Sequence, residues 1–155
     1  MTLRYKRIWI ESGLFFLFLV LLACAPSPRF YLQYGNTFSE SELDKILAAN
    51  PLPATENIRL TTLGQTQEVS HHIVQVRDRE PPHIHREHDA TVVLLKGQGY
   101  LLLDGRRMDL KVGDVLFIAR RAVHYFVNTF NEPSVALAVF SPPFDGKDIV
   151  PAGQP

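Results

Sequence analysis

Short apolar segments separated by turn residues dominate the chain from residue 58 onward. The candidate strands are 58–63, 67–76, 82–85, 91–95, 99–104, 106–110, 114–118, 123–128 and 134–140. The pair Asp104-Gly105 suits a two-residue hairpin turn, because both central positions of such a turn need positive φ. Many short strands with close turns and no interleaved helices indicate an antiparallel sandwich or barrel. The pattern therefore predicts an all-β domain.

A helical pattern precedes the strands, in the segment "SESELDKILAAN". Its apolar stripe consists of Leu43, Ile46 and Leu47. Ser39 and Glu42 have the spacing of a capping box, and Asn50-Pro51 ends the helix. We therefore expect one short N-terminal helix that packs on the barrel and carries no chemistry.

The N-terminus has a third pattern, in which basic residues precede an apolar run of 11 residues from Leu14 to Cys24. A membrane-spanning helix needs about 20 apolar residues, so this run is typical of a secretory signal peptide. The residues "LLAC" (21–24) resemble the lipobox of bacterial lipoproteins. That resemblance implies cleavage before Cys24 and lipidation of its thiol. With Ala25 next, it also implies anchoring in the bacterial cell envelope, at the outer membrane facing the periplasm. An ordinary signal peptide with an incidental cysteine is the alternative.

The segment after Cys24 is expected to be a tether. Pro26 and Pro28 favour an extended chain, and the aromatic residues that follow are expected to dock on the domain itself. The predicted organisation is a lipoprotein signal peptide over 1–23, a tether over 24–38, a helix and linker over 39–57, and a barrel domain over 58–155.

Composition and charge exclude several classes of function. Hydrophobic residues make up 46% of the chain and charged residues 21%, which argues against disorder. The 16 basic residues balance the 16 acidic ones, so no electrostatic footprint for nucleic acid is present. The single cysteine excludes an internal disulfide.

Histidines supply the candidate chemistry, since all six lie between residues 71 and 124. His83 and His85 are separated by one residue, so on a strand they project from the same face and can share one metal ion. Two imidazoles do not fill a coordination sphere, and His124 is the expected third ligand. By the same period of two, Phe126 and Asn128 share the face of His124.

Two spaced motifs around these histidines resemble those of the cupin family, G-x5-H-x-H-x(3,4)-E-x6-G and G-x5-P-x-G-x2-H-x3-N. The matching residues are His83, His85 and Gly97 in the first motif and Gly113, His124 and Asn128 in the second. Other residues stand at three turn positions of the motifs, namely Arg77, Ala119 and Arg121. The resemblance covers roughly residues 58–144 and implies a small antiparallel double-stranded β-helix, the cupin or jelly-roll barrel. It also implies pairing of two copies into a homodimer through strand edges.

The fourth ligand of the family motif, a glutamate, has no counterpart here. Counting back from Gly97 places it at Ala90, whereas the shorter spacing places it at Asp89, with His88 as a further alternative. We favour the register in which Ala90 faces the barrel interior, together with Val92, and Asp89 faces away.

These residues predict a divalent transition metal, Fe, Mn, Ni, Cu or Zn, held by His83, His85 and His124, with Asp89 as a candidate fourth ligand. A metal-free barrel that binds a small molecule is the alternative. The candidate pocket residues are His72, Val92, Phe126 and Asn128. Of the pair His71 and His72, one must face inward as a pocket wall or core residue, and His88 is expected to face solvent. The resemblance allows either an enzyme of dioxygenase or isomerase type or a binding module without turnover.

Overall fold

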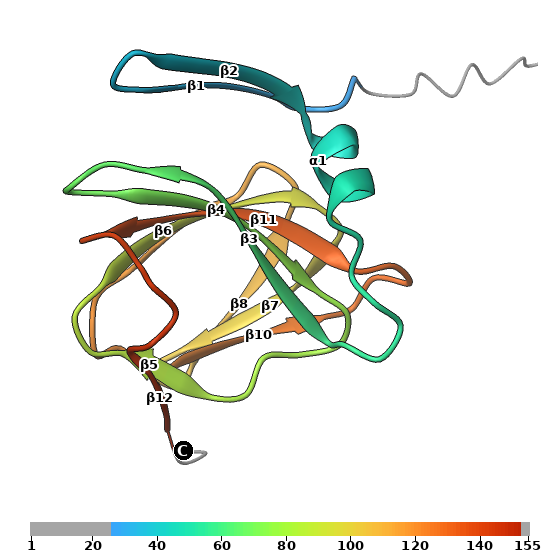
Figure 1. The fold of residues 1–155 in the computed structure, drawn as a ribbon. Helices are drawn as coiled ribbons and strands as arrows, with labels where there is room; N and C mark the ends of the chain where they lie inside the picture. Colours follow the sequence, from blue (N-terminus) through green and yellow to red (C-terminus); the bar gives the residue numbers. More distant parts are fainter. Residues whose placement is uncertain (1–25, 153–155) are drawn as a thin grey trace, which may run out of the picture.

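Two five-stranded antiparallel sheets form the body of the protein (Figure 1). The computed structural model describes residues 26–152. Its elements are β1 (Arg29–Tyr34), β2 (Thr37–Glu42), α1 (Leu43–Ala49), β3 (Ile58–Gln65), β4 (Ser70–Val76), β5 (His83–His85), β6 (Asp89–Lys96), β7 (Gln98–Leu103), β8 (Arg106–Lys111), β9 (Val115–Ile118), β10 (His124–Asn128), β11 (Ser134–Ser141) and β12 (Ile149–Pro151).

The strand order confirms the predicted fold class. One sheet has the order β12-β5-β10-β7-β8 and the other the order β3-β4-β11-β6-β9, so neighbouring strands are often distant in the sequence. An apolar core lies between the sheets, made of Ala90, Leu94, Leu101, Leu110, Ile118, Ala138, Phe140 and Phe144. This is the small antiparallel double-stranded β-helix expected from the strand pattern and the motifs.

Turn residues determine the two connections that flank β7. Asp104 and Gly105 have φ of 47° and 80°, as the two-residue hairpin between β7 and β8 requires. Gly97, between β6 and β7, has a φ of 88°, and a Cβ added there would lie 2.2 Å from the Oγ of Ser134 on β11. The matched motif glycine is therefore needed both for its backbone conformation and for the close approach of β11.

The N-terminal part of the described chain differs from the predicted tether and helix cap. Residues 29–42 form the hairpin β1–β2, in which Ser39 pairs with Leu32. Because Ser39 belongs to a strand, the predicted capping box is wrong: α1 begins after Glu42 and has no side-chain cap. The expected docking is confirmed for Phe30, which is buried beside α1 and the outer face of the barrel, whereas Tyr31 and Phe38 are exposed.

The predicted signal peptide over 1–23 and Cys24 lie outside the residues that the structure describes. Within residues 26–152, the single helix α1 is too short to cross a membrane.

Candidate metal centre

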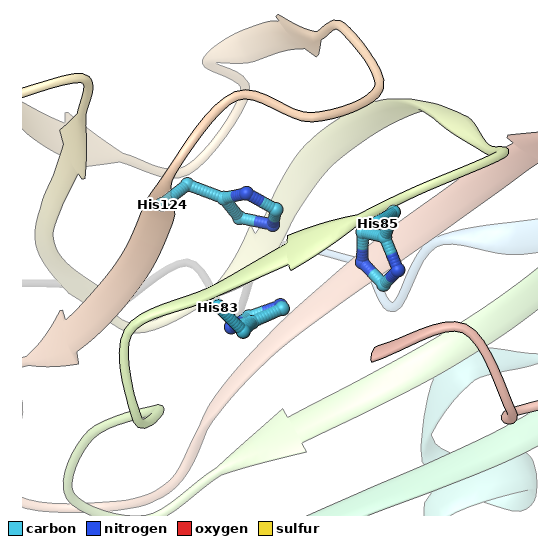
Figure 2. A group of neighbouring side chains, drawn as sticks. All are labelled: His83, His85 and His124. Atoms are coloured by element: carbon cyan, nitrogen blue, oxygen red, sulfur yellow. The ribbon is translucent and has the colours of Figure 1, made fainter. Parts of the chain in front are cut away.

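Strands β5 and β10 bring three histidines together inside the barrel (Figure 2). His83 on β5 pairs directly with His124 on β10, and His85 follows two residues later on the same face. All three side chains are buried, and a potential ligand atom of each lies within 4.8 Å of those of the others. The structure thus assembles the three histidines that the sequence singled out.

Hydrogen bonds fix the orientation of each ring. Every Nδ1 faces an oxygen acceptor: the carbonyl of Pro81 at 2.8 Å for His83, the carbonyl of Ala122 at 2.9 Å for His124, and Oδ1 of Asp148 at 3.2 Å for His85. A carbonyl or carboxylate oxygen only accepts, so each Nδ1 carries the proton. In the neutral rings, Nε2 then keeps its lone pair for a metal ion.

Burial keeps two of these imidazoles neutral. It lowers the pKa of His124 to about 4, with the nearby His83 acting in the same direction. Burial also lowers the pKa of His85, although the hydrogen bond to Asp148 opposes that shift. Neutral imidazole is the form that coordinates metal ions, so these two rings are ready to bind at neutral pH.

The histidines open onto a narrow apolar cavity of about 90 Å³ between the sheets. One water molecule needs roughly 10–15 Å³ of cavity volume, so this cavity has room for several groups of that size. It is lined by Val74, Val76, Glu80, His83, His85, Ala90, Val92, Leu94, Leu101, Leu110, Leu116, Ile118, His124, Phe126, Ser134, Val135, Ala136, Ala138 and Phe140.

Glu80 is a cavity residue that the sequence analysis missed. Its Oε2 accepts the backbone N–H of Phe126 at 3.0 Å, and its own N–H donates to the carbonyl of Phe126 at 2.8 Å. Burial raises the pKa of this carboxyl, against the effect of the nearby His83. Glu80 lies in the loop before β5, where no periodic pattern assigns a direction to a side chain. The sequence feature that could have pointed to Glu80 is its position three residues before His83.

The structure adopts the register in which Ala90 faces the cavity. Ala90 is buried, whereas the carboxylate of Asp89 forms an ion pair with Arg120 at 2.7 Å and accepts the backbone N–H of Arg120 at 2.8 Å. These hydrogen bonds lower the pKa of Asp89 to about 2. Asp89 is therefore engaged outside the barrel, and the structure does not bring it to the three imidazoles.

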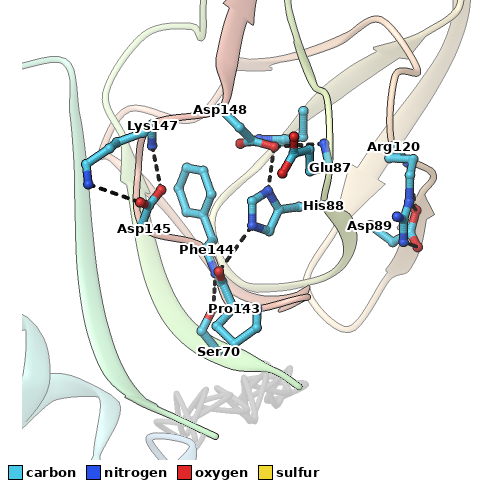
Figure 3. A network of polar contacts seen from close by, with 11 residues as sticks. Ser70, Glu87, His88, Asp89, Arg120, Pro143, Phe144, Asp145, Lys147 and Asp148 are labelled. Atoms are coloured by element: carbon cyan, nitrogen blue, oxygen red, sulfur yellow. Dashed lines mark hydrogen bonds and ion pairs between the residues drawn. The ribbon is translucent and has the colours of Figure 1, made fainter. Parts of the chain in front are cut away.

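His88 does not face solvent, so that expectation is wrong. Its side chain is buried, Nδ1 contacts Oδ2 of Asp148, and Nε2 lies 3.1 Å from the carbonyl oxygen of Pro143 (Figure 3). Both partners belong to the segment after β11, whose strand β12 pairs with β5. His88 therefore lies in a polar network and not in the histidine cluster.

Two of the four candidate pocket residues, Val92 and Phe126, line the cavity. His72 faces inward as expected for one of the two adjacent histidines, but as a core residue: it hydrogen-bonds the hydroxyls of Ser70 and Thr62. Asn128 does not line the cavity either. Its amide binds backbone carbonyls of the neighbouring loops and its oxygen accepts the Ser134 hydroxyl, so it holds the end of β10 in place.

Comparisons with known proteins agree with this geometry. The cupin domain model matches residues 70–140. An uncharacterised protein of Aquifex aeolicus is 44% identical over 115 residues, which cover 73% of this chain and 94% of that protein. An uncharacterised protein of Methanocaldococcus jannaschii is 28% identical and covers 55% of this chain and 68% of its own. The chain belongs to the cupin superfamily.

Solved structures with low sequence identity share the fold. KdgF from a Halomonas species has a TM-score of 0.56 at 23% identity, covering 63% of this chain and 91% of KdgF. Pac13 of Streptomyces, a nucleoside dehydratase, has a TM-score of 0.53 at 19% identity over 62% of this chain and 78% of its own. At these identities the likeness shows the architecture alone, and activity must be argued from the site.

Proposed function

We propose that this protein binds a divalent transition metal through His83, His85 and His124 and uses it to hold a small molecule in the barrel. The observation that carries the proposal is the shared orientation of the three buried rings, whose Nδ1 atoms all face acceptors. Each ring therefore offers an Nε2 lone pair, and the potential ligand atoms lie close enough to share one ion.

The donor set suits Fe, Mn, Ni, Cu or Zn, because imidazole is a ligand common to these metals. Three neutral imidazoles leave the charge of the ion uncompensated and leave coordination positions open, which favours an oxygen donor from the ligand. A bound ion would act as a Lewis acid toward that donor.

The residues that line the cavity indicate which kind of ligand would fit beside the metal. They are mostly aliphatic and aromatic, and Glu80 is the acidic residue among them. A ligand that fits would be small and largely apolar, with one end that coordinates the metal and one polar group that bonds the Glu80 carboxyl.

Metal analysis of the purified full chain in detergent tests the metal site. We expect about one transition-metal ion per chain in the wild type, since one cluster of three ligands is present among the described residues, and almost none in the double variant His83→Ala/His85→Ala. Equal, near-zero metal in both proteins after loading would leave the metal-free binding barrel as the function.

Conversion of the ligand is the second candidate function, and Glu80 is the observation that favours it. A carboxyl with a raised pKa that lines the cavity beside the candidate metal ligands can accept a proton from a bound molecule or donate one to it. Incubation with a panel of small carbonyl compounds, followed by mass spectrometry, tests turnover. Loss of turnover with retained ligand binding in Glu80→Gln supports this role, whereas unchanged turnover in Glu80→Gln contradicts it.

We also propose that the chain is a lipoprotein anchored in the bacterial cell envelope through Cys24. The support is the "LLAC" sequence after a short apolar run with a basic start. Wild-type protein should partition with membranes and incorporate labelled palmitate, and Cys24→Ser should do neither. Labelling that persists in Cys24→Ser would end this proposal.

A further inference from the structure

We infer that Asp148, in the segment after β11, is a positioning residue that holds and polarises the His85 ring for metal binding. The inference rests on the proposed metal function and names a determinant of it outside the motif histidines. The Asp148 carboxylate contacts the backbone of Glu87 and the ring of His88 (Figure 3), and it also reaches Nδ1 of His85.

The segment 142–151, here called the C-terminal strap, is attached to the strand that carries two of the candidate ligands. Its strand β12 pairs with β5 on the side away from β10, with Ile149 opposite His85. Earlier in the strap, Phe144 stacks on Phe140 with ring centroids 4.6 Å apart, and both rings lie edge-on to His85. The strap therefore forms one wall around His85.

The Asp148 carboxylate joins three donors within this wall. Oδ1 lies 3.2 Å from Nδ1 of His85, and Oδ2 accepts the backbone N–H of Glu87 at 3.0 Å and contacts Nδ1 of His88. The Asp148 side chain is 13% exposed, so both carboxylate oxygens are engaged and largely shielded from solvent.

His88 helps to hold the Asp148 carboxylate in place, because its Nδ1 contacts Oδ2. Its Nε2 lies against the carbonyl oxygen of Pro143, so the ring spans the strap from one acceptor to another. The contacts of Oδ2 with His88 and with the backbone of Glu87 restrict rotation of the carboxylate away from His85. Asp148 is thus held in place by contacts that do not involve the metal ligands.

The His85 ring differs from the rings of His83 and His124 in the acceptor that its Nδ1 faces. His83 and His124 each bond a carbonyl two residues earlier in their own segments, whereas the acceptor for His85 is a charged group 63 residues away in sequence. A carboxylate on the Nδ1–H fixes the tautomer and makes Nε2 a stronger donor than a neutral acceptor does. The strap therefore contributes to metal affinity through one ring.

The variant Asp148→Asn tests this, because it removes the charge and keeps the shape. Asp145→Asn is the matched control: Asp145 lies on the same strap, is exposed, and contacts Lys147. We measure Zn²⁺ affinity of the full chain by competition with a chromophoric chelator. Asp148→Asn should weaken binding by about 10- to 100-fold, the usual effect of losing an outer partner of a ligand. Asp145→Asn should bind as the wild type does.

A double-variant cycle separates positioning from general destabilisation. If Asp148 acts through His85, Asp148→Asn adds little further loss in a His85→Ala background, since the ring it orients is gone. Fully additive losses would overturn the inference and make Asp148 a purely structural residue. Wild-type affinity in Asp148→Asn would also overturn it and leave the metal function intact. No Zn²⁺ binding by the wild type itself would overturn both.

Discussion

At the scale of single residues, the chemistry of the site depends on which face of a strand each side chain takes. Ala90 and Asp89 are adjacent on β6, yet one lines the cavity and the other pairs with Arg120 outside. Because side chains alternate along a strand, the two positions have opposite relations to the metal ligands. Small changes at these positions therefore test the site directly.

Replacing Asp89 and replacing Ala90 should affect metal affinity differently. Asp89→Ala should leave metal affinity nearly unchanged, because the carboxylate it removes points away from the imidazoles. Ala90→Glu should tighten binding by about tenfold, roughly 1.4 kcal/mol, because it adds an anionic oxygen inside the cavity. Chelator competition measures both. A large loss for Asp89→Ala with no gain for Ala90→Glu would contradict the placement of these residues.

Acid should destabilise the metal-free protein through His124. Its pKa is about 4 in the fold and near 6.5 when unfolded, so between these values the unfolded chain binds more protons. Stability should then fall by about 3 kcal/mol from this residue as the pH drops from 6.5 to 4. Urea unfolding of chelator-treated protein across this range measures the effect. His124→Gln should have a shallower dependence, and an equal slope in both proteins would contradict this origin.

At the scale of elements, the hairpin β1–β2 and helix α1 form a layer outside the barrel (Figure 1). Phe30 joins this layer to the barrel, since it packs with Leu43 and Ile46 of the helix region and with Ile73 and Val135 of the sheet. Tyr34 adds a polar contact, because its hydroxyl lies 3.0 Å from Nδ1 of His71. The layer is thus anchored by a few specific side chains.

Truncation of the anchoring aromatic ring should therefore loosen this layer. Phe30→Ala should lower the free energy of unfolding by about 3 kcal/mol, as expected for a buried phenylalanine. Phe38→Ala, on the same hairpin with Phe38 62% exposed, should change it by less than about 0.5 kcal/mol. Denaturant unfolding compares the two variants, and similar small losses would show that the hairpin does not contribute to stability.

At the scale of the whole molecule, the strand β5, which carries two of the candidate metal ligands, has little backbone pairing with the rest of its sheet. β5 pairs with β10 at one position, His83 opposite His124, and carries the C-terminal strap on its other edge. A metal ion bound by histidines of both strands would tie β5 and the strap to the rest of the sheet. Binding that occurs only in the folded state stabilises the entire domain by mass action.

Metal loading should consequently raise the thermal stability of the protein. At free Zn²⁺ of 100 times the dissociation constant, the gain is about 2.7 kcal/mol. Differential scanning calorimetry with and without Zn²⁺ measures it, and His83→Ala/His85→Ala should show no shift. A rise of the same size in the double variant would point to binding elsewhere on the chain.

The sequence by itself determined the strand succession and three of the side chains at the site. Alternation along short segments predicted β3 to β11 because period-two patterning is a local property that follows directly from strand geometry. His83 and His85 share a face for the same reason, and the motif spacing indicated His124. The hairpin at Asp104-Gly105 is equally local, since its turn type depends on two residues.

Features that depend on pairing between distant segments of the chain were decided by the tertiary structure. β12 lacks a strong alternation of its own, and it becomes a strand because the edge of β5 offers partners for its backbone groups. Asp148 lies 63 residues from His85 in sequence and reaches it because β12 adds to β5. Glu80 enters the cavity because its loop is bonded to β10. Local patterning specifies which face a residue takes on its own strand, whereas contacts between distant segments depend on which strands become neighbours.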